Sequence, residues 1–571
     1  MKQLAQKQFA IANAVFGMFA LLVVLFCGLS LPVQAESPLR YDLELDLDVE
    51  AAVLRGKARI EYIHTGPRSL KSLLFRLDAN REAQMEVQEV KTREGLVLPA
   101  RPYQYEYLEQ QVSDPYLFQV FLPEELKSGE RIELHFDYVI RHVPHPKGSY
   151  YLIDDRARLG LGSWYPRFVP FRDGVWQVYD RLPADYKVAA RASKNLYVIS
   201  PLAPVSINNT NHSYEYSVNQ ATEMSLVYTP DLLLRSAELD GISIRFYYDS
   251  NLQKWAPMTL EIIQSALKFL RERYSAYPLK RLTVVSVEDS RYPLVASDQL
   301  LILRNTFSSE TDEGIVRRRL SEHIMLGLAQ QFWGYQVSQP PDQMPWLTQG
   351  MSLFLGQNFL QAQEKKPFLM GEALTREYLR AARQGWSTSL QASRAQLERM
   401  PYDSFSVLAQ GKGYTMMRQL ERLLGKASLQ KAENQLLQQY RNKQVTPEIF
   451  QKTLQEVSGK DLEWFFAQWV KRGDVLDYSI QSVQQVASNG IVKATINLQR
   501  LGQITMPVTI ALKLDNGETV LKLWDGTQLS DRLVVELKRP LKEVILDPAE
   551  ATPDIQRSNN RQAVAPLQNF Q

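Results

Sequence analysis

The chain has 571 residues, of which 45% are hydrophobic and 23% are charged, and its formal net charge is +3. This length is too great for one small hydrophobic core, so two to four domains are expected. The composition is that of an ordinary soluble globular protein. The charge is spread along the chain without a long basic block, which argues against a nucleic-acid partner.

The first 35 residues have the pattern of a secretory signal. Lys2 and Lys7 form a basic start, and an apolar or small run follows over Phe9–Leu31. Val33–Ala35 places small residues at the −3 and −1 positions of a signal-peptidase site. The run is also long enough to span a bilayer as an uncleaved anchor. Both interpretations predict an exported protein, in the periplasm or on the outer face of the cytoplasmic membrane.

Cys27 is the only cysteine, and it lies inside this apolar run. A chain cleaved after residue 35 would have no thiol, so it could form neither a disulfide nor a thiolate metal site. A large exported protein without disulfides is typical of the bacterial envelope.

Residues 38–245 are predicted to form an N-terminal β domain. Segments such as Tyr41–Glu50 and Arg131–Ile140 alternate apolar and polar residues with a period of two, and Pro and Gly turns separate the segments. This alternation predicts sheets that have one face in water.

Residues 250–474 are predicted to form a mixed and then mainly helical domain. Pro257–Tyr274 has helical spacing, and a proline suits the first turn of a helix. Leu282–Asp289 and Gln299–Leu303 are short apolar runs that indicate buried strands. Helical patterns fill most of residues 312–472.

Residues 477–550 are predicted to form a small C-terminal β-sandwich. Four segments alternate with a period of two, and Asp515–Gly517 between two of them is a strong hairpin signal. Residues 551–571 are polar and are expected to be a flexible tail. The chain is therefore predicted to be an α+β multidomain protein with a β domain, a mixed-to-helical domain and a β-sandwich.

Two segments of the helical region have a notable spacing. "LGLAQQFWG" runs over Leu326–Gly334 and "WLTQG" over Trp346–Gly350, with eighteen residues between Gln330 and Gln349. Zinc peptidases of the gluzincin type carry H-E-x-x-H on one helix and a Glu eighteen residues later on the next. Two His at i and i+4 lie on one helix face, so both can bind one ion.

These segments resemble the motifs of the aminopeptidase N family, which are membrane alanyl aminopeptidases and their relatives. In that family the first helix reads H-E-x-x-H-Q-W-F-G and the second W-L-N-E-G. Further pieces of the chain resemble the family at Trp164–Pro166, Lys412–Gly413 and Val457–Val470, so the resemblance covers about residues 38–550. It implies a thermolysin-like domain at 250–474 and zinc-dependent removal of residues from peptide N-termini.

The resemblance places the zinc ligands on Leu326, Gln330 and Gln349, and the general base on Gly327. Leucine has no lone pair for a metal, and glutamine is a neutral and poor zinc ligand. Glycine cannot accept a proton from a zinc-bound water. The sequence therefore predicts that zinc and its chemistry are absent, and that no cofactor replaces them.

Two more functional positions of the family are also changed. The Tyr that would stabilise the oxyanion falls on Gln410, and the Glu that would hold the substrate amine falls on Ser297, inside Leu294–Asp298. The cleft between the β and helical domains is expected to persist with a neutral floor. Its candidate binding residues are Ser297, Asp298, Gln330, Gln331, Gln349 and Gln410.

Other interpretations of these residues remain open. The motif spacing could be coincidence, with the helix an ordinary core helix. Glu322 and His323 could belong to a shifted motif, but no second His follows at the required spacing. His142 and His145 could touch one ion, yet their Pro-rich segment offers no nearby carboxylate. No G-x-S-x-G segment supports a serine hydrolase.

Three functional hypotheses follow. The first is a catalytically inactive aminopeptidase N-like protein that binds a peptide or protein partner, or acts as a scaffold, in the bacterial envelope. Its N-terminus would associate with the membrane if the apolar segment is kept. The second is an active zinc aminopeptidase. The third is an enzyme of another class that uses the same cleft, for which the sequence offers no nucleophile.

Overall fold

The structure is a computed structural model, and it describes residues 37–567 with gaps. The residues left out within that range are 49, 52, 82–83, 108–109, 142–149, 153–163, 179, 193–195, 209, 230–231, 275–279, 288–293, 305–308, 341–343, 364, 366, 393–396, 398–399 and 442. The predicted signal segment with Cys27, and the pair His142 and His145, therefore lie outside the described residues.

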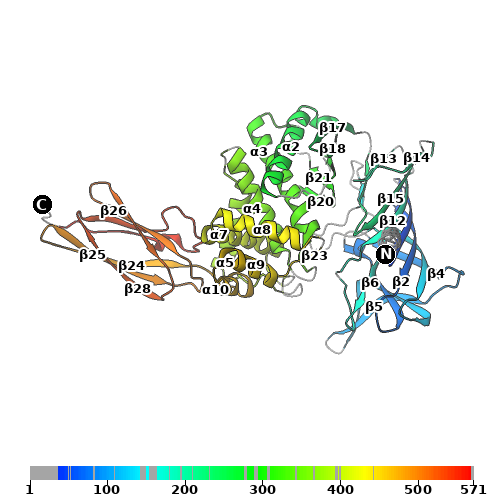
Figure 1. Cartoon of the computed structure of the whole chain (residues 1–571), viewed down its shortest axis with the longest axis horizontal. Helices are drawn as coiled ribbons and strands as arrows, with labels where there is room; N and C mark the ends of the chain where they lie inside the picture. Colours follow the sequence, from blue (N-terminus) through cyan, green and yellow to red (C-terminus); the bar gives the residue numbers. More distant parts are fainter. Residues whose placement is uncertain are drawn as a thin grey trace, which may run out of the picture.

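The described chain is elongated, with the N-terminal strands at one end, the helices in the middle and the C-terminal strands at the other end (Figure 1). This mixture of helices and several sheets agrees with an α+β multidomain protein. Among the helices that the structure describes, none is long and apolar enough to cross a membrane.

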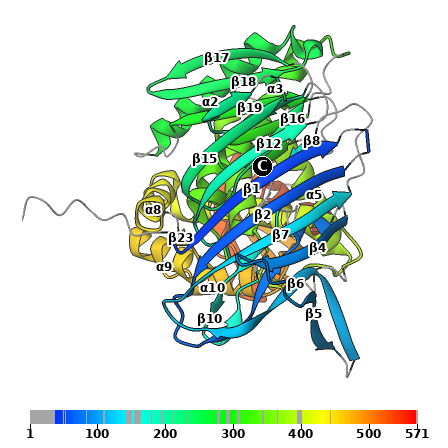
Figure 2. The same ribbon diagram turned by 90° about the vertical axis from the view of Figure 1, so that its right-hand side faces the viewer.

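The largest N-terminal sheet has seven strands in the order β14-β15-β12-β1-β2-β7-β4 (Figure 2). Their bounds are β1 Leu39–Asp48, β2 Val53–Ile63, β4 Gln84–Thr92, β7 Arg131–Arg141, β12 Ala184–Ala192, β14 Ser206–Asn208 and β15 Ser213–Ala221. All neighbours are antiparallel except β1 and β12. The predicted alternation is observed, since β1 buries every second residue.

The polar face of this sheet is organised by charge. Asp42 on β1 pairs in register with Lys187 on β12 and with Arg59 on β2, and Arg59 pairs in turn with His135 on β7. Asp42 and Arg59 form an ion pair. Opposite charges on neighbouring strands favour this register, which leaves the apolar residues on the other face.

Smaller N-terminal sheets complete the first part of the chain. One has the order β5-β6-β3-β9 and another β13-β16-β8, and β10 and β11 form a hairpin. Their bounds are β3 Leu70–Arg76, β5 Ala100–Tyr107, β6 Gln110–Leu126, β8 Tyr150–Leu152, β9 Arg167–Val169, β10 Phe171–Arg172, β11 Val175–Trp176, β13 Tyr197–Ile199 and β16 Leu226–Thr229.

A five-stranded sheet of order β17-β18-β19-β21-β20 begins the middle part. Its strands are β17 Leu233–Leu239, β18 Ile242–Tyr248, β19 Arg281–Val287, β20 Leu294–Ser297 and β21 Leu300–Arg304. The predicted boundary near residue 245 is therefore wrong, because β18 pairs in parallel with β19. Alternation predicts a strand correctly but does not say which sheet the strand joins.

Helices fill the rest of the middle part, and α2 and α3 pack beside the five-stranded sheet (Figure 1). The helices are α2 Ala256–Arg273, α3 Glu313–Gln330, α4 Trp346–Gln363, α5 Leu369–Arg383, α7 Gly413–Leu424, α8 Lys426–Gln439, α9 Pro447–Ser458 and α10 Glu463–Phe466. Wider turns extend them at η3 Gln331–Gln336, η4 Phe405–Lys412 and η5 Ala467–Lys471, and β22 Val337–Ser338 pairs with β23 Lys443–Gln444.

The local signals for helix ends are observed. The Thr446 side chain accepts a hydrogen bond from the backbone N–H of Ile449 at the start of α9, and Gly459 ends this helix with a φ of 67°. Only glycine adopts such a left-handed conformation at little cost. This helix lies within residues 312–472, for which helical patterns are predicted.

The C-terminal part consists of a sheet of order β24-β25-β28 and a sheet of order β27-β26-β29-β30. Their bounds are β24 Tyr478–Ser488, β25 Ile491–Arg500, β26 Val508–Leu514, β27 Thr519–Trp524, β28 Ser530–Leu537, β29 Leu541–Leu546 and β30 Arg561–Ala563. The predicted hairpin at Asp515–Gly517 joins β26 to β27, and Gly517 has a φ of 90°.

The prediction of a flexible tail from residue 551 is wrong for the part of the tail that the structure describes. β30 pairs with β29, and Asp554 is 0% exposed. The Asp554 carboxylate accepts hydrogen bonds from the backbone N–H of Tyr478 at 2.9 Å and of Gln556 at 2.8 Å. The polar residues of this segment therefore satisfy buried backbone groups as well as facing water.

Candidate functional site

The two motif segments lie on α3 and α4, which pack against each other. A Cβ built on Gly334, just after α3, would lie 3.2 Å from Cγ2 of Thr348 on α4. The absence of a side chain at residue 334 therefore allows the close approach. The three positions assigned to zinc ligands are all buried, at 6% exposure for Leu326, 5% for Gln330 and 1% for Gln349.

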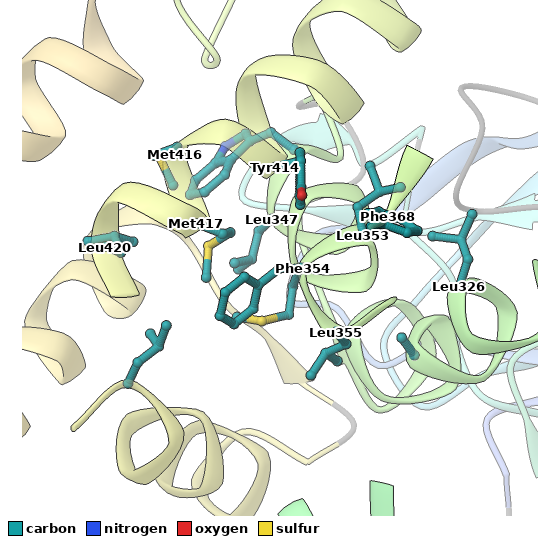
Figure 3. Close-up of a cluster of buried hydrophobic side chains, with 14 of the residues drawn as sticks. Leu326, Leu347, Leu353, Phe354, Leu355, Phe368, Tyr414, Met416, Met417 and Leu420 are labelled. Atoms are coloured by element: carbon teal, nitrogen blue, oxygen red, sulfur yellow. The ribbon is translucent and has the colours of Figure 1, made fainter. Parts of the chain in front are cut away.

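Leu326, at the first ligand position, belongs to the apolar core. It lies at one side of a buried cluster that also contains Leu353, Phe368 and Met417 (Figure 3). Burial of a leucine side chain is worth roughly 1.5–3 kcal/mol relative to exposure. This position is thus used for packing.

A glycine contact fixes the second motif segment. A Cβ on Gly350 of α4 would lie 2.5 Å from the carbonyl carbon of Gly413 on α7, so neither helix can carry a side chain there. This approach places Gln349 beside Gln410 of η4. The Nε2 of Gln410 donates a hydrogen bond of 3.1 Å to the Oε1 of Gln349. The fold therefore brings together the third ligand position and the oxyanion position, each occupied by a neutral amide.

Gly327, at the position that the resemblance assigns to the general base, packs closely against the five-stranded sheet. A Cβ there would lie 2.8 Å from Cδ2 of Leu301 on β21 and 3.0 Å from Cδ1 of Leu294 on β20. Leu301 is 0% exposed and Leu294 is 7% exposed. The helix thus packs directly onto the sheet at the point where a catalytic glutamate would need to project.

The residues present do not fit a zinc ion. The ligand positions offer one aliphatic side chain and two amides, which are unsuited to zinc. Within the described parts of residues 37–567, no group of three or more His, Cys, Asp or Glu could hold a metal ion.

Ser297, at the amine-binding position, contacts a carboxylate from the N-terminal part. Its hydroxyl donates to Oε1 of Glu223 at 2.7 Å, and the backbone N–H of Asp298 donates to the same oxygen at 3.1 Å. Arg181 donates to Oε2 of Glu223 at 3.4 Å. Sequence reasoning missed Glu223 and Arg181, because no motif or spacing connects them to residue 297.

Gln331 holds the edge of the five-stranded sheet. Its Nε2 donates to the carbonyl of Ser297 at 2.9 Å, and its Oε1 accepts from the backbone N–H of Gln299 at 2.9 Å. Tyr335 donates to the carbonyl of Ala296 at 2.7 Å. Side chains from η3 therefore donate hydrogen bonds to backbone carbonyls of β20.

The six predicted cleft residues differ in accessibility. Ser297, Gln330, Gln331 and Gln349 are all 5% exposed or less, whereas Asp298 and Gln410 are partly exposed. Among them, the side chains of Gln349 and Gln410 contact each other through a hydrogen bond. Gln331 is tied instead to the backbone of the β20–β21 turn.

The aromatic end of the first motif is anchored by a buried ion pair. The indole Nε1 of Trp333 donates to the hydroxyl of Tyr274 at 3.1 Å, and this hydroxyl donates to Glu433 at 3.1 Å. Arg273 donates to both oxygens of Glu433, at 2.8 and 2.9 Å. Burial, and next the charge of Glu433, raises the pKa of Tyr274 far above its usual value.

Glu322 and His323, considered as a shifted motif, have other surroundings. The Glu322 carboxylate accepts a hydrogen bond of 3.1 Å from the backbone N–H of Leu369 at the start of α5. Burial raises the pKa of Glu322. Burial, with a smaller effect of Arg319, lowers the pKa of His323 to about 4. Glu322 therefore serves as a cap for α5.

Comparison with known families adds independent evidence. Residues 258–469 match the family described as the peptidase family M1 domain. This part of the chain is an M1 peptidase domain. The M1 family is the aminopeptidase N family of gluzincin metallopeptidases, so the resemblance predicted from the motifs is confirmed. The match runs from α2 to η5 and includes both motif helices. No curated protein matches the chain.

Proposed function

We propose that this protein is a catalytically inactive relative of the aminopeptidase N family that binds a peptide or protein, or acts as a scaffold, in the bacterial envelope. The M1 domain supports the family relationship. The loss of all three ligand types supports the absence of zinc chemistry. The N-terminal sequence pattern supports export.

The contact of Gly327 with Leu301 carries this proposal. A glutamate at residue 327 would begin with a Cβ 2.8 Å from a buried leucine. Loss of a single catalytic group could be balanced by a neighbouring one, but here a side chain at residue 327 would also force the buried Leu301 to shift. The proposal therefore rests on the packing at residue 327 as well as on the absence of zinc-binding side chains.

Metal content and turnover of the purified full chain test the proposal together. We expect less than a tenth of an equivalent of zinc after incubation with zinc and desalting, and no hydrolysis of aminoacyl-arylamides above the buffer rate. Zinc at one equivalent per chain, with hydrolysis that a chelator abolishes, would overturn the proposal and favour the active zinc aminopeptidase that the M1 domain otherwise suggests.

The proposed location and partner need a separate experiment. Fractionation of cells that express the full chain should recover the protein with the periplasm or the outer face of the inner membrane. Crosslinking in intact cells, followed by purification under denaturing conditions, should then recover a defined envelope protein or peptide. Recovery of the protein in the cytosol would contradict this part of the proposal.

A further inference from the structure

Lys412 is a fully buried lysine at the end of η4, with 0% exposure. It lies two residues after Gln410 and directly before Gly413, which contacts α4. A charged ammonium is costly to bury without a partner. The contacts of this side chain therefore need an explanation.

The amine of Lys412 connects two other segments of the chain. Its Nζ donates to the carbonyl of Thr388 at 2.8 Å and to the carbonyl of Arg472 at 3.0 Å. Among the residues that the structure describes, no carboxylate forms an ion pair with this Nζ. The acidic group that acts on the pKa of Lys412 is Asp474, whose carboxylate is paired with Arg472 at 2.7 Å.

These two segments form the joint between the helices and the C-terminal sandwich. A Cβ on Gly473 would lie 2.5 Å from the carbonyl oxygen of Ser387, so the linker packs tightly on the loop after α5. The backbone N–H of Leu390 donates to the carbonyl of Val470 at 2.9 Å. Lys412 thus ties η4, this loop and the linker together.

Burial favours the neutral form of Lys412. Burial lowers the pKa of Lys412 to about 7, against a smaller opposing effect of Asp474. The other titratable groups of the joint are Tyr378 and Tyr402, and burial raises the pKa of both, so both are neutral. Arg472 is also charged, and its guanidinium is paired with Asp474.

We propose that protonation of Lys412 loosens the joint between the M1 domain and the C-terminal β-sandwich. A neutral amine has two N–H groups, and both are used by the carbonyls of Thr388 and Arg472. Protonation adds a third N–H and a buried charge. The added N–H group and the buried charge are stabilised best when water enters the joint or when the carboxylate of Asp474 leaves Arg472. This inference does not depend on whether the M1 domain is catalytically inactive.

Hydrogen exchange of the full chain at pH 8 and pH 6 tests this inference. The amides of residues 386–390 and 470–474 are followed after correction for the intrinsic pH dependence of exchange. Because an exposed lysine has a pKa near 10.4, a native pKa of about 7 predicts about tenfold more opening at pH 6 than at pH 8. A wild-type chain without this increase would overturn the proposal.

Two lysine variants provide the comparison. Lys412→Met removes the titrating group and should abolish the increase. Lys460→Met is the matched control, because Lys460 is exposed and also donates to a carbonyl, that of Leu423, and it should behave as wild type. An increase that persists in Lys412→Met would overturn the proposal.

A second variant keeps the test decisive if Lys412→Met does not fold. Asp474→Asn removes the acidic influence that raises the pKa of Lys412. The midpoint pH of the change in exchange should therefore move to a lower value. An unchanged midpoint would also overturn the proposal.

Discussion

The Nε2 of Gln410 donates a hydrogen bond of 3.1 Å to the Oε1 of Gln349. In the M1 pattern these positions carry the oxyanion tyrosine and the third zinc ligand. Here two neutral amides satisfy each other, in a region held by the contact of Gly350 with Gly413. The fold brings these two side chains together in a contact that requires no metal.

Restoration of the ligand side chains should restore metal binding without catalysis. The triple variant Leu326→His, Gln330→His, Gln349→Glu supplies the two His at i and i+4 and the carboxylate that the family pattern calls for. We expect about one zinc per chain, a rise in thermal stability on zinc addition, and no hydrolysis, because Gly327 supplies no base. Gln349→Glu alone is the control and should bind no zinc. Zinc-dependent hydrolysis by the triple variant would contradict the role given to residue 327.

Gly327→Ala should destabilise the protein, although alanine is the better helix former by about 1 kcal/mol. The added Cβ would approach Leu301 to 2.8 Å, and overpacking of this kind costs about 1–3 kcal/mol. Gly314→Ala in the same helix is the control, since it meets one exposed side chain and should be close to neutral. Denaturant unfolding measures both. Addition of Leu301→Val, which removes the contacting δ-carbons, should recover part of the loss.

Glu433→Gln should cost about 3–5 kcal/mol in the free energy of unfolding, because it leaves the buried Arg273 without its counter-charge. It should also weaken the support of Trp333, visible as a change in tryptophan fluorescence. Glu261→Gln removes the exposed partner of Arg317 and should cost at most about 1 kcal/mol. Equal losses of unfolding free energy in the two variants would mean that the buried ion pair stabilises the protein no more than the exposed one.

His323 should make the protein less stable in acid. Its native pKa of about 4 lies below the unfolded value of 6.5, so the unfolded chain binds a proton first. Stability should therefore fall as the pH drops from 6.5 towards 4. His323→Gln should flatten the pH dependence of the unfolding midpoint over this range. If the unfolding midpoint of His323→Gln depends on pH as steeply as that of wild type, the prediction that His323 causes this dependence is wrong.

Deletion of residues 551–571 should destabilise the C-terminal sandwich. The deletion removes β30 and the Asp554 carboxylate that binds the N–H of Tyr478. We expect faster proteolysis within residues 478–546 and a lower unfolding midpoint. Deletion of residues 568–571 alone is the control and should have little effect. Resistance equal to wild type in the longer deletion would support the flexible tail that the sequence suggests.

The sequence by itself determined the local periods and the side-chain types at the motif positions. Period-two alternation indicated strands such as β1 and β7, and helical spacing with Pro257 in the first turn indicated α2. The motif spacing indicated the family, which the match over residues 258–469 confirms. Side-chain type alone shows that Leu326 cannot bind zinc. These features depend on residues that are close together in the chain.

The tertiary structure decided which distant residues meet. It placed β18 beside β19, Leu301 against Gly327 and Glu223 against Ser297. It also turned a polar tail into part of a sheet through β30. None of these contacts has a local signal, because each depends on how whole elements pack and on which buried polar groups need partners. Packing therefore explains why a side chain at residue 327 would press on Leu301, whereas the sequence shows only that residue 327 is a glycine.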